Sequence, residues 1–110
     1  MVIDDRLGWA LAQSGRAAAG LIQRSCAENG LKPAQVQVLM LLHQHGVLSQ
    51  QRLIEALGVD PSVLVTLLNE LERAGLALRR RDPADRRRHI VECTERGGAV
   101  LAEIDGAVRG

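Results

Sequence analysis

Six arginines lie within ten residues of the sequence, three at 79–81 and three at 86–88. Between them, Asp82-Pro83-Ala84-Asp85 has the composition of a type I turn, with Asp at its first position and Pro at its second. Leu76–Arg81 and Arg88–Thr94 are predicted to be short strands, so the arginines belong to the two limbs of a hairpin. Because charges at this density repel one another, the hairpin is expected to lie near anions. Phosphates are the obvious partner, and a narrow A·T-rich minor groove also attracts an inserted arginine. A solvated charge cluster is the alternative.

The positive charge of the chain is concentrated around this hairpin. From Arg73 to Arg96 there are eight arginines and four acidic residues, a local charge of +4, whereas the remainder has six basic and nine acidic residues, or −3. A chain with a net charge of only +1 and one basic stretch indicates a localised anion-binding surface. Lys32 is the only lysine, and arginine suits bidentate contacts with phosphate and guanine. Trp9 is the only aromatic residue, which excludes single-strand binding through stacked bases.

A helix is predicted from Pro61 to about Ala74, because Asp60 precedes it as an N-cap, proline suits the first helical position and Gly75 follows it. Its apolar residues gather on one side: Leu64, Leu67, Leu68 and Leu71. Its polar residues gather on the opposite side: Ser62, Thr66, Asn69 and Arg73. Since the leucines must face a core, the polar face is presented outward, where it could enter a DNA major groove. A solvated surface helix is the alternative.

The preceding segments would position this helix. Pro33 opens a helix that runs to His45, and Ser49 is a good N-cap for a short helix at 50–57. Gly58-Val59 then makes a tight turn, so that two short helices joined by a few residues form a helix-turn-helix candidate. Val47-Leu48 is short and apolar and is predicted to add one short strand to a small sheet.

Helices are also predicted at both ends of the chain. Residues 5–28 have apolar residues at near-helical spacing and end at Asn29-Gly30. Thr94 can cap a last helix, whose apolar stripe still continues where the sequence stops. Such a helix is expected to be shortened or to pack on another chain. The stripe consists of Val100, Leu101, Ile104 and Val108.

Other kinds of chemistry find little support in the sequence. Cys26 and Cys93 are far apart and match no metal-ligand spacing, so they are expected to be small buried side chains of a reduced, cytoplasmic protein. No signal peptide and no apolar run long enough to span a bilayer are present, which favours a soluble, intracellular protein. We find no Gly-rich phosphate loop, nucleophile elbow or pair of metal-binding histidines, and therefore expect no enzymatic activity, cofactor or metal.

The order of these elements is that of a winged helix, and three motifs point to a family. They are Leu71-Glu72-Arg73-Ala74-Gly75-Leu76, then Asp82-Pro83-Ala84-Asp85-Arg86-Arg87-Arg88, then Thr94-Glu95-Arg96-Gly97. This succession resembles the MarR (multiple antibiotic resistance regulator) family over roughly residues 31–101. The fold expected is mainly α with a small β-hairpin wing, a winged helix-turn-helix with flanking dimerisation helices. Residues 1–30 would form the N-terminal helix of the dimerisation region, 31–94 the DNA-binding domain, and 95–110 the start of the C-terminal dimerisation helix.

The resemblance implies a homodimer that binds a pseudo-palindromic operator in double-stranded DNA, with helix 61–74 in the major groove and the wing in the minor groove. Arg86 would lie at the wing tip, and Asp85 would orient a neighbouring arginine through an ion pair. The predicted DNA contacts are Ser62, Thr66, Asn69 and Arg73 in the recognition helix, Ser49 and Gln50 at the start of helix 50–57, and Arg80, Arg81, Asp85, Arg86, Arg87 and Arg88 in the wing.

The chain departs from the family in two respects. Val63 and Val65 stand where polar residues are frequent, so base contacts are expected to be sparse or to use thymine methyl groups. Most of the second half of the dimerisation region is also missing, which puts dimerisation of this chain in doubt. The alternative function is a winged-helix module that binds a protein and has lost DNA binding.

Family members often bind a small aromatic effector between the dimerisation helices and the winged domain, and this implies a ligand-responsive repressor. Trp9, His43 and His45 are the candidate ligand contacts in this sequence. Packing for the tryptophan and simple solvation for the histidines are the alternatives. Some relatives sense peroxides through a cysteine of the first helix, but for Cys26 a buried structural role is favoured.

Overall fold

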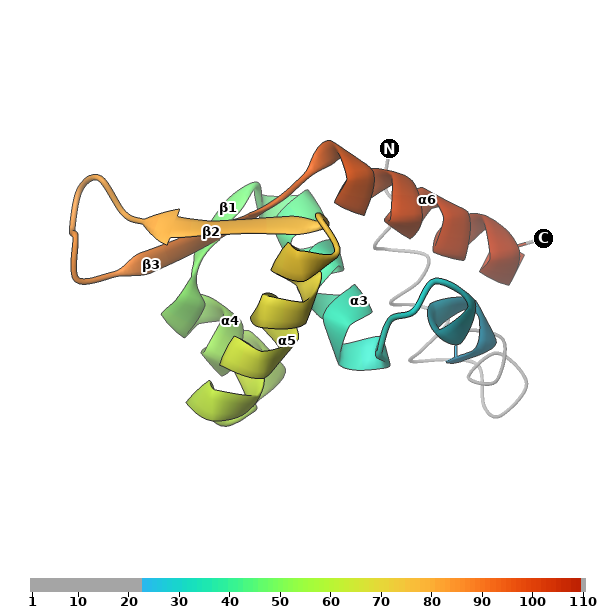
Figure 1. The fold of residues 1–110 in the computed structure, drawn as a ribbon, viewed down its shortest axis with the longest axis horizontal. Coiled ribbons are helices and arrows are strands. Elements are labelled where there is room, and N and C mark those ends of the chain that lie inside the picture. Colours follow the sequence, from blue (N-terminus) through green and yellow to red (C-terminus); the bar gives the residue numbers. More distant parts are fainter. Residues whose placement is uncertain (1–22, 110) are drawn as a thin grey trace.

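The computed structural model describes residues 23–109, which form helices with a small sheet along one side of them (Figure 1). Residues 23–28 are helical and end at a turn formed by Asn29 and Gly30. The elements that follow are α3 (Pro33–His45), β1 (Val47–Ser49), α4 (Gln50–Leu57), α5 (Pro61–Arg73), β2 (Ala77–Arg81), β3 (His89–Cys93) and α6 (Glu95–Arg109). This arrangement confirms the predicted winged helix-turn-helix, in which β2 and β3 extend beyond the helices as the wing.

Side-chain caps mark where two of the helices begin. The Ser49 Oγ accepts a hydrogen bond of 3.1 Å from the Arg52 backbone N–H, and the Thr94 Oγ1 accepts one of 3.0 Å from Gly97 N–H. Both predicted caps are therefore confirmed. The cap predicted at Asp60 is only partly correct, because this residue occupies the N-cap position of α5 but its side chain makes no capping hydrogen bond. Gly58, with φ at +66°, ends α4 in the left-handed conformation that glycine adopts readily.

The sheet has three antiparallel strands in the order β1-β3-β2. Val91 of β3 pairs with Leu48 of β1 on one side and with Arg79 of β2 on the other. Residues that pair directly share a face of the sheet, and Val91 is buried in the core. This face is therefore the inner one, and the register directs Arg79 toward the helices.

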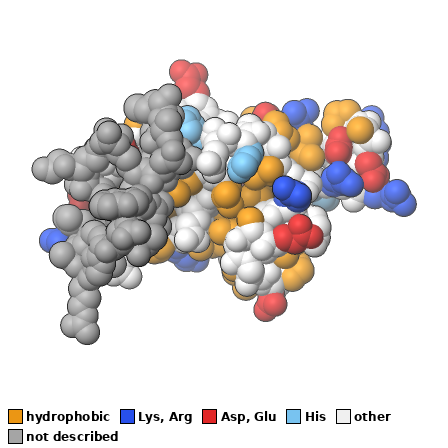
Figure 2. Space-filling model, turned by 180° about the vertical axis from the view of Figure 1, so that it is seen from behind, with side chains coloured by type: hydrophobic (Ala, Val, Ile, Leu, Met, Phe, Trp, Pro, Cys, Tyr) orange, Lys and Arg blue, Asp and Glu red, His pale blue; other side chains and the backbone are white. Residues whose placement is uncertain are grey.

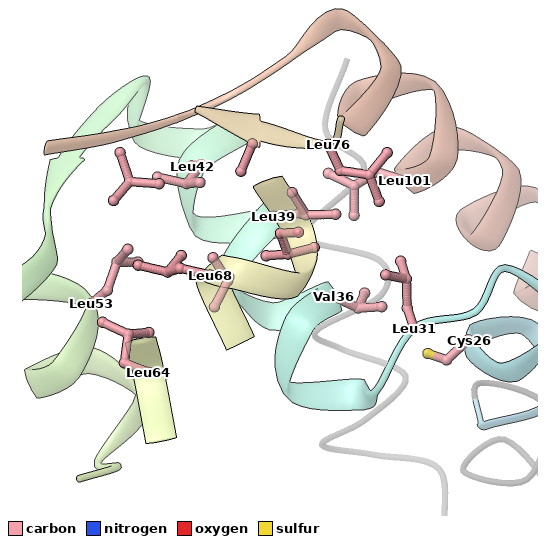
Figure 3. Close-up of a cluster of buried hydrophobic side chains, with 14 of the residues drawn as sticks. Cys26, Leu31, Val36, Leu39, Leu42, Leu53, Leu64, Leu68, Leu76 and Leu101 are labelled. Atoms are coloured by element: carbon pink, nitrogen blue, oxygen red, sulfur yellow. The ribbon is translucent and has the colours of Figure 1, made fainter. Parts of the chain in front are cut away.

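Leucines form most of the hydrophobic core of the described residues, and the majority of these leucines come from four helices (Figure 3). Leu64 and Leu68 of α5 pack with Leu53 of α4 and Leu42 of α3, and all four are at most 1% exposed. Full burial stabilises each such side chain by roughly 1.5–3 kcal/mol. All the leucines of α5 that were predicted to face inward are buried. The leucine side of α5 therefore faces the core and its opposite side faces outward.

The start of α6 lies very close to the β2–β3 hairpin. A Cβ atom added at Gly97 would overlap the Leu76 carbonyl oxygen and would lie 2.7 Å from the Cys93 Sγ. The Thr94 Oγ1 also donates a 2.7 Å hydrogen bond to the Gly75 carbonyl oxygen. These contacts fix α6 against the end of the recognition helix. Of the predicted stripe in α6, Leu101 and Ile104 are buried, as expected.

The other sequence predictions have mixed outcomes. The two cysteines are free: Cys26 is buried as predicted, whereas Cys93 is only half-buried and so lies at the edge of the core. Trp9 and most of helix 5–28 fall outside the described residues. No helix in residues 23–109 is long and apolar enough to cross a membrane.

Candidate nucleic-acid interface

The recognition helix α5 presents an exposed polar face, as its sequence predicted. Ser62, Thr66 and Arg73 are exposed, while the leucines on the opposite side are buried. The Thr66 hydroxyl donates a 3.1 Å hydrogen bond to the Ser62 carbonyl oxygen one turn earlier. Asn69 differs from the other three, because it is half-buried on the flank of the helix that faces the wing.

A polar cluster holds one flank of α5 against the start of α3. The Gln35 side chain is 2% exposed; its Nε2 donates to the Glu70 Oε1 at 2.7 Å and to the Leu67 carbonyl oxygen at 3.4 Å. Lys32 adds a 3.2 Å ion pair to Glu70. Sequence reasoning missed this cluster. A glutamine inside an apolar helical stripe was the available indication, since a buried amide needs hydrogen-bond partners.

Arg79 holds the other flank of α5. Its Nη2 donates to the Asn69 Oδ1 at 2.8 Å and forms a 3.1 Å ion pair with the Glu72 Oε1, while its Nη1 donates to the Gln50 Oε1 at 3.4 Å. The side chains of Arg79 and Glu72 are only 22% and 31% exposed. One guanidinium thus joins β2, the start of α4 and the recognition helix. Sequence reasoning grouped Arg79 with the hairpin arginines and did not predict this bridging role.

Two aspartates shape the loop at the wing tip. The Asp82 Oδ1 accepts from Ala84 N–H at 2.8 Å, and the Asp85 Oδ1 accepts from Arg87 N–H at 3.1 Å. Two backbone hydrogen bonds close two successive turns. Asp85 N–H donates to the Asp82 carbonyl oxygen, and Arg88 N–H donates to the Asp85 carbonyl oxygen. The hydrogen bonds that Arg87 donates from its backbone and side chain hold the pKa of Asp85 below its usual value.

The wing arginines are not equivalent. Arg80 pairs with Glu92 at 3.8 Å on the outer face of the sheet, and Arg81 donates a 2.7 Å hydrogen bond to the Arg86 carbonyl oxygen. Arg87 forms a 3.2 Å ion pair with Asp85, as the family resemblance implied for an arginine next to this aspartate. Within residues 23–109, the exposed side chains of Arg86 and Arg88 form no ion pair. Figure 2 shows basic side chains gathered at the end of the molecule formed by the wing.

An open hollow of about 430 Å³ lies between the wing and the start of α4. It is lined by Gln50, Gln51, Asp85, Arg87, Arg88 and His89. The N–H groups in the first turn of a helix favour an anion, and two arginines border the same space. Of the two residues predicted at the start of α4, Gln50 lines the hollow, whereas Ser49 is engaged as the N-cap. The hollow has the charge and the donors to accept one phosphate of a nucleic-acid backbone.

Comparison with known proteins identifies the family to which this fold and surface belong. The MarR family model matches residues 29–88, more than half of the chain and all of the helix-turn-helix and wing loop. The chain belongs to the MarR family.

Individual MarR-type proteins resemble it along most of its length. It is 31% identical over 99 residues to the HTH-type transcriptional repressor NicR of Pseudomonas putida, covering 90% of the chain and 63% of NicR. It is 31% identical over 80 residues to the HTH-type transcriptional repressor MdtR of Bacillus subtilis, covering 73% of the chain and 52% of MdtR. The chain thus spans about half to two thirds of the length of these relatives.

A solved structure of NadR in complex with 4-hydroxyphenylacetate has the same fold, with a TM-score of 0.77 and 26% identity over 90% of this chain and 70% of that one. In this MarR-family chain, one of the predicted ligand residues lies beside a hollow. His43 borders a space of about 390 Å³ between the end of α3, β3 and the start of α6. His45 is exposed and is not among its lining residues.

The valines in which this MarR-family chain departs from the usual pattern are on different sides of α5. Val63 is 45% exposed and lines a largely apolar hollow of about 450 Å³ with Lys32 and Ala34 of the neighbouring segment. Val65 is half-buried. The exposed surface of α5 is therefore apolar on the α3 side and polar in its centre and on the wing side.

Proposed function

We propose that this MarR-family chain is a transcriptional regulator that binds double-stranded DNA sequence-specifically, with α5 in the major groove and the wing in the adjacent minor groove. The observation that carries the proposal is the link that Arg79 makes between α4, α5 and β2. This link holds β2 of the wing against α5, and within residues 23–109 the side chains of Arg86 and Arg88 in the wing loop form no ion pair. A helix fits the major groove, and arginines bind phosphates and narrow minor grooves.

Each predicted side chain apart from Asn69 then has a role in the proposal. Ser62, Thr66 and Arg73 face base edges and phosphates directly, because they are exposed on the centre of the helix. Gln50, Arg87 and Arg88 surround one backbone phosphate. Arg86 enters the minor groove and contacts a phosphate at its edge. Three further side chains support the wing through contacts within it, those of Arg80, Arg81 and Asp85. Ser49 caps α4 and so holds the first turn of this helix in place.

We infer further that the regulator is a repressor that acts as a homodimer on a pseudo-palindromic operator and responds to a small aromatic ligand. The repressor role is supported by the names of NicR and MdtR, and the ligand class by the 4-hydroxyphenylacetate bound to NadR. Two-fold symmetry would place the two recognition helices one helical turn of DNA apart. We assign it no catalytic role. A protein that binds an operator must work where the DNA is, which supports a cytoplasmic location.

Fluorescence anisotropy with the 110-residue chain tests the proposal. The probes are a labelled duplex from upstream of its own coding sequence and a scrambled duplex of the same composition, at several salt concentrations. We expect tighter binding to the upstream duplex and a steep decrease of affinity with salt. Equal, weak binding to both would contradict sequence-specific recognition by this chain and would indicate that it does not dimerise on DNA. Binding to neither duplex at low salt would refute the proposal and favour a module that binds a protein through the apolar surface around Val63.

A further inference from the structure

The side-chain amide of Asn69 is held in one orientation by the wing. Its Oδ1 accepts a 2.8 Å hydrogen bond from Arg79 Nη2. A guanidinium carries only donors, so the amide oxygen must face it and the amide nitrogen must point elsewhere. A flipped amide would set its own N–H groups against those of Arg79 and would lose this hydrogen bond.

Arg79 cannot easily follow a movement of Asn69, because two other groups hold it. The Glu72 carboxylate lies 3.1 Å from the same Nη2 atom, and the Gln50 Oε1 lies 3.4 Å from Nη1. Charge-assisted hydrogen bonds of this kind are among the stronger ones, and the pair is largely shielded from water. The orientation of the Asn69 amide is therefore fixed before any DNA is bound.

This orientation limits what Asn69 can recognise. A free asparagine reads adenine with two bonds, accepting from N6 and donating to N7. Because its oxygen is turned toward the guanidinium of Arg79, the groups that Asn69 can direct at a base edge are the two N–H donors of Nδ2. In the major groove guanine offers two acceptors, O6 and N7, and thymine offers O4. Adenine sets a donor beside its only acceptor, and cytosine offers a donor alone.

We propose that Asn69 is a donor-only specificity residue that selects a keto base, guanine or thymine, at one position of the operator, and that Arg79 is the positioning residue that imposes this choice. The inference rests on the proposed function, since it assumes that α5 enters the major groove. It also predicts which bases are preferred, whereas the presence of a polar residue on a recognition helix does not by itself predict this.

The test begins with a pool of duplexes randomised over about two helical turns of DNA, from which the 110-residue chain selects its preferred sites. The same selection with Asn69→Ala identifies the position where the base preference disappears. Four duplexes that differ only at this position are then compared by anisotropy. For the unmodified chain we expect the guanine or thymine duplex to bind about tenfold tighter than the cytosine duplex, and also tighter than the adenine duplex; tenfold corresponds to about 1.4 kcal/mol.

Two further variants change the hydrogen-bonding groups in opposite ways. Asn69→Asp keeps the bond to Arg79 and replaces the donor by an acceptor, so it should reverse the order in favour of cytosine or adenine. Arg79→Met frees the amide to turn, so the affinity for the adenine duplex should approach that for guanine. Arg24→Met is the control: it removes an exposed arginine from the helical segment at residues 23–28, to which no DNA contact is assigned, and the ranking should not change. Rankings within one variant are insensitive to a general loss of affinity.

The outcomes separate this inference from the proposed function. If the unmodified chain selects sites but prefers adenine at the Asn69 position, the amide is not restricted and the inference is wrong. It is also wrong if Asn69→Ala weakens all four duplexes equally, because the residue then does not discriminate between the bases. If the unmodified chain enriches no sequence from the pool, the proposed function itself fails.

Discussion

The arginine at the wing tip offers a quantitative test of how the wing meets DNA. Arg86 is exposed, and its side chain forms no ion pair within residues 23–109. Its backbone carbonyl accepts the hydrogen bond from Arg81, and an alanine would retain that group. The substitution Arg86→Ala should therefore remove one positive charge and leave the loop conformation intact. A change in DNA binding then reports the lost contact and not a rearranged wing.

The expected magnitude follows from counterion release. Each phosphate contact with duplex DNA contributes about −0.9 to the slope of log affinity against log salt concentration. If Arg86 contacts one phosphate in each subunit of a homodimer, Arg86→Ala should make the slope shallower by about 1.8. Between about 50 mM and about 200 mM salt, the ratio of unmodified to variant affinity should then decrease roughly twelvefold.

Fluorescence anisotropy over this range of salt provides the measurement. Arg24→Ala is the matched control, because it removes the same charge from an exposed position in the helical segment at the other end of the molecule (Figure 1). The control should leave the slope unchanged. A slope for Arg86→Ala equal to that of the unmodified chain would show that this side chain contacts no phosphate and would refute the assignment of the wing tip.

Three further predictions concern the fold and its titratable groups. Gly97→Ala should lower the free energy of unfolding by about 1–3 kcal/mol in urea denaturation, because the new methyl group overlaps the hairpin, whereas Gly98→Ala, with no neighbour in reach, should not be destabilising. The pKa of Asp85 is lower in the folded chain than in the unfolded chain. The contribution of its carboxylate to the free energy of unfolding is therefore fully present above the pKa that Asp85 has in the unfolded chain, and it is lost as the pH falls through the lower pKa of the folded chain. An NMR titration of this carboxyl group that gives an ordinary aspartate pKa would contradict the geometry of the wing tip. Burial raises the pKa of Cys26, so a thiol reagent at neutral pH should modify it slowly until the chain is unfolded; rapid reaction of the native protein would show an activated cysteine.

The elements of the fold were largely predictable because their boundaries depend on local chemistry. Pro33 and Pro61 each open a helix, and the hydroxyls of Ser49 and Thr94 cap the next ones. These features act over three or four residues and can be recognised in the sequence. The family resemblance was equally accessible, since the wing motif around Asp85 is continuous and the loop it forms uses its own side chains.

The links between elements could not be predicted in the same way. Gln35 meets Glu70 across 35 residues, and Arg79 meets Gln50 across 29, so both contacts depend on how separate helices pack. The half-buried position of Cys93 likewise depends on the approach of α6. Sequence periodicity indicates which face of a helix is inward, but it does not indicate which polar side chain on its flank will find a partner.

The pleat of the sheet explains why the two arginine triplets differ in their chemistry. In a strand, successive side chains point to opposite faces, so three consecutive arginines cannot serve one surface. In β2, Arg79 therefore points inward to the helices and Arg80 outward to Glu92. The second triplet, at 86–88, lies in a loop closed by backbone turns, where no pleat constrains it. Its guanidinium groups can be directed to one ligand. Substitutions in the first triplet should therefore act mainly through the structure of the interface, and those in the second through the affinity for phosphate.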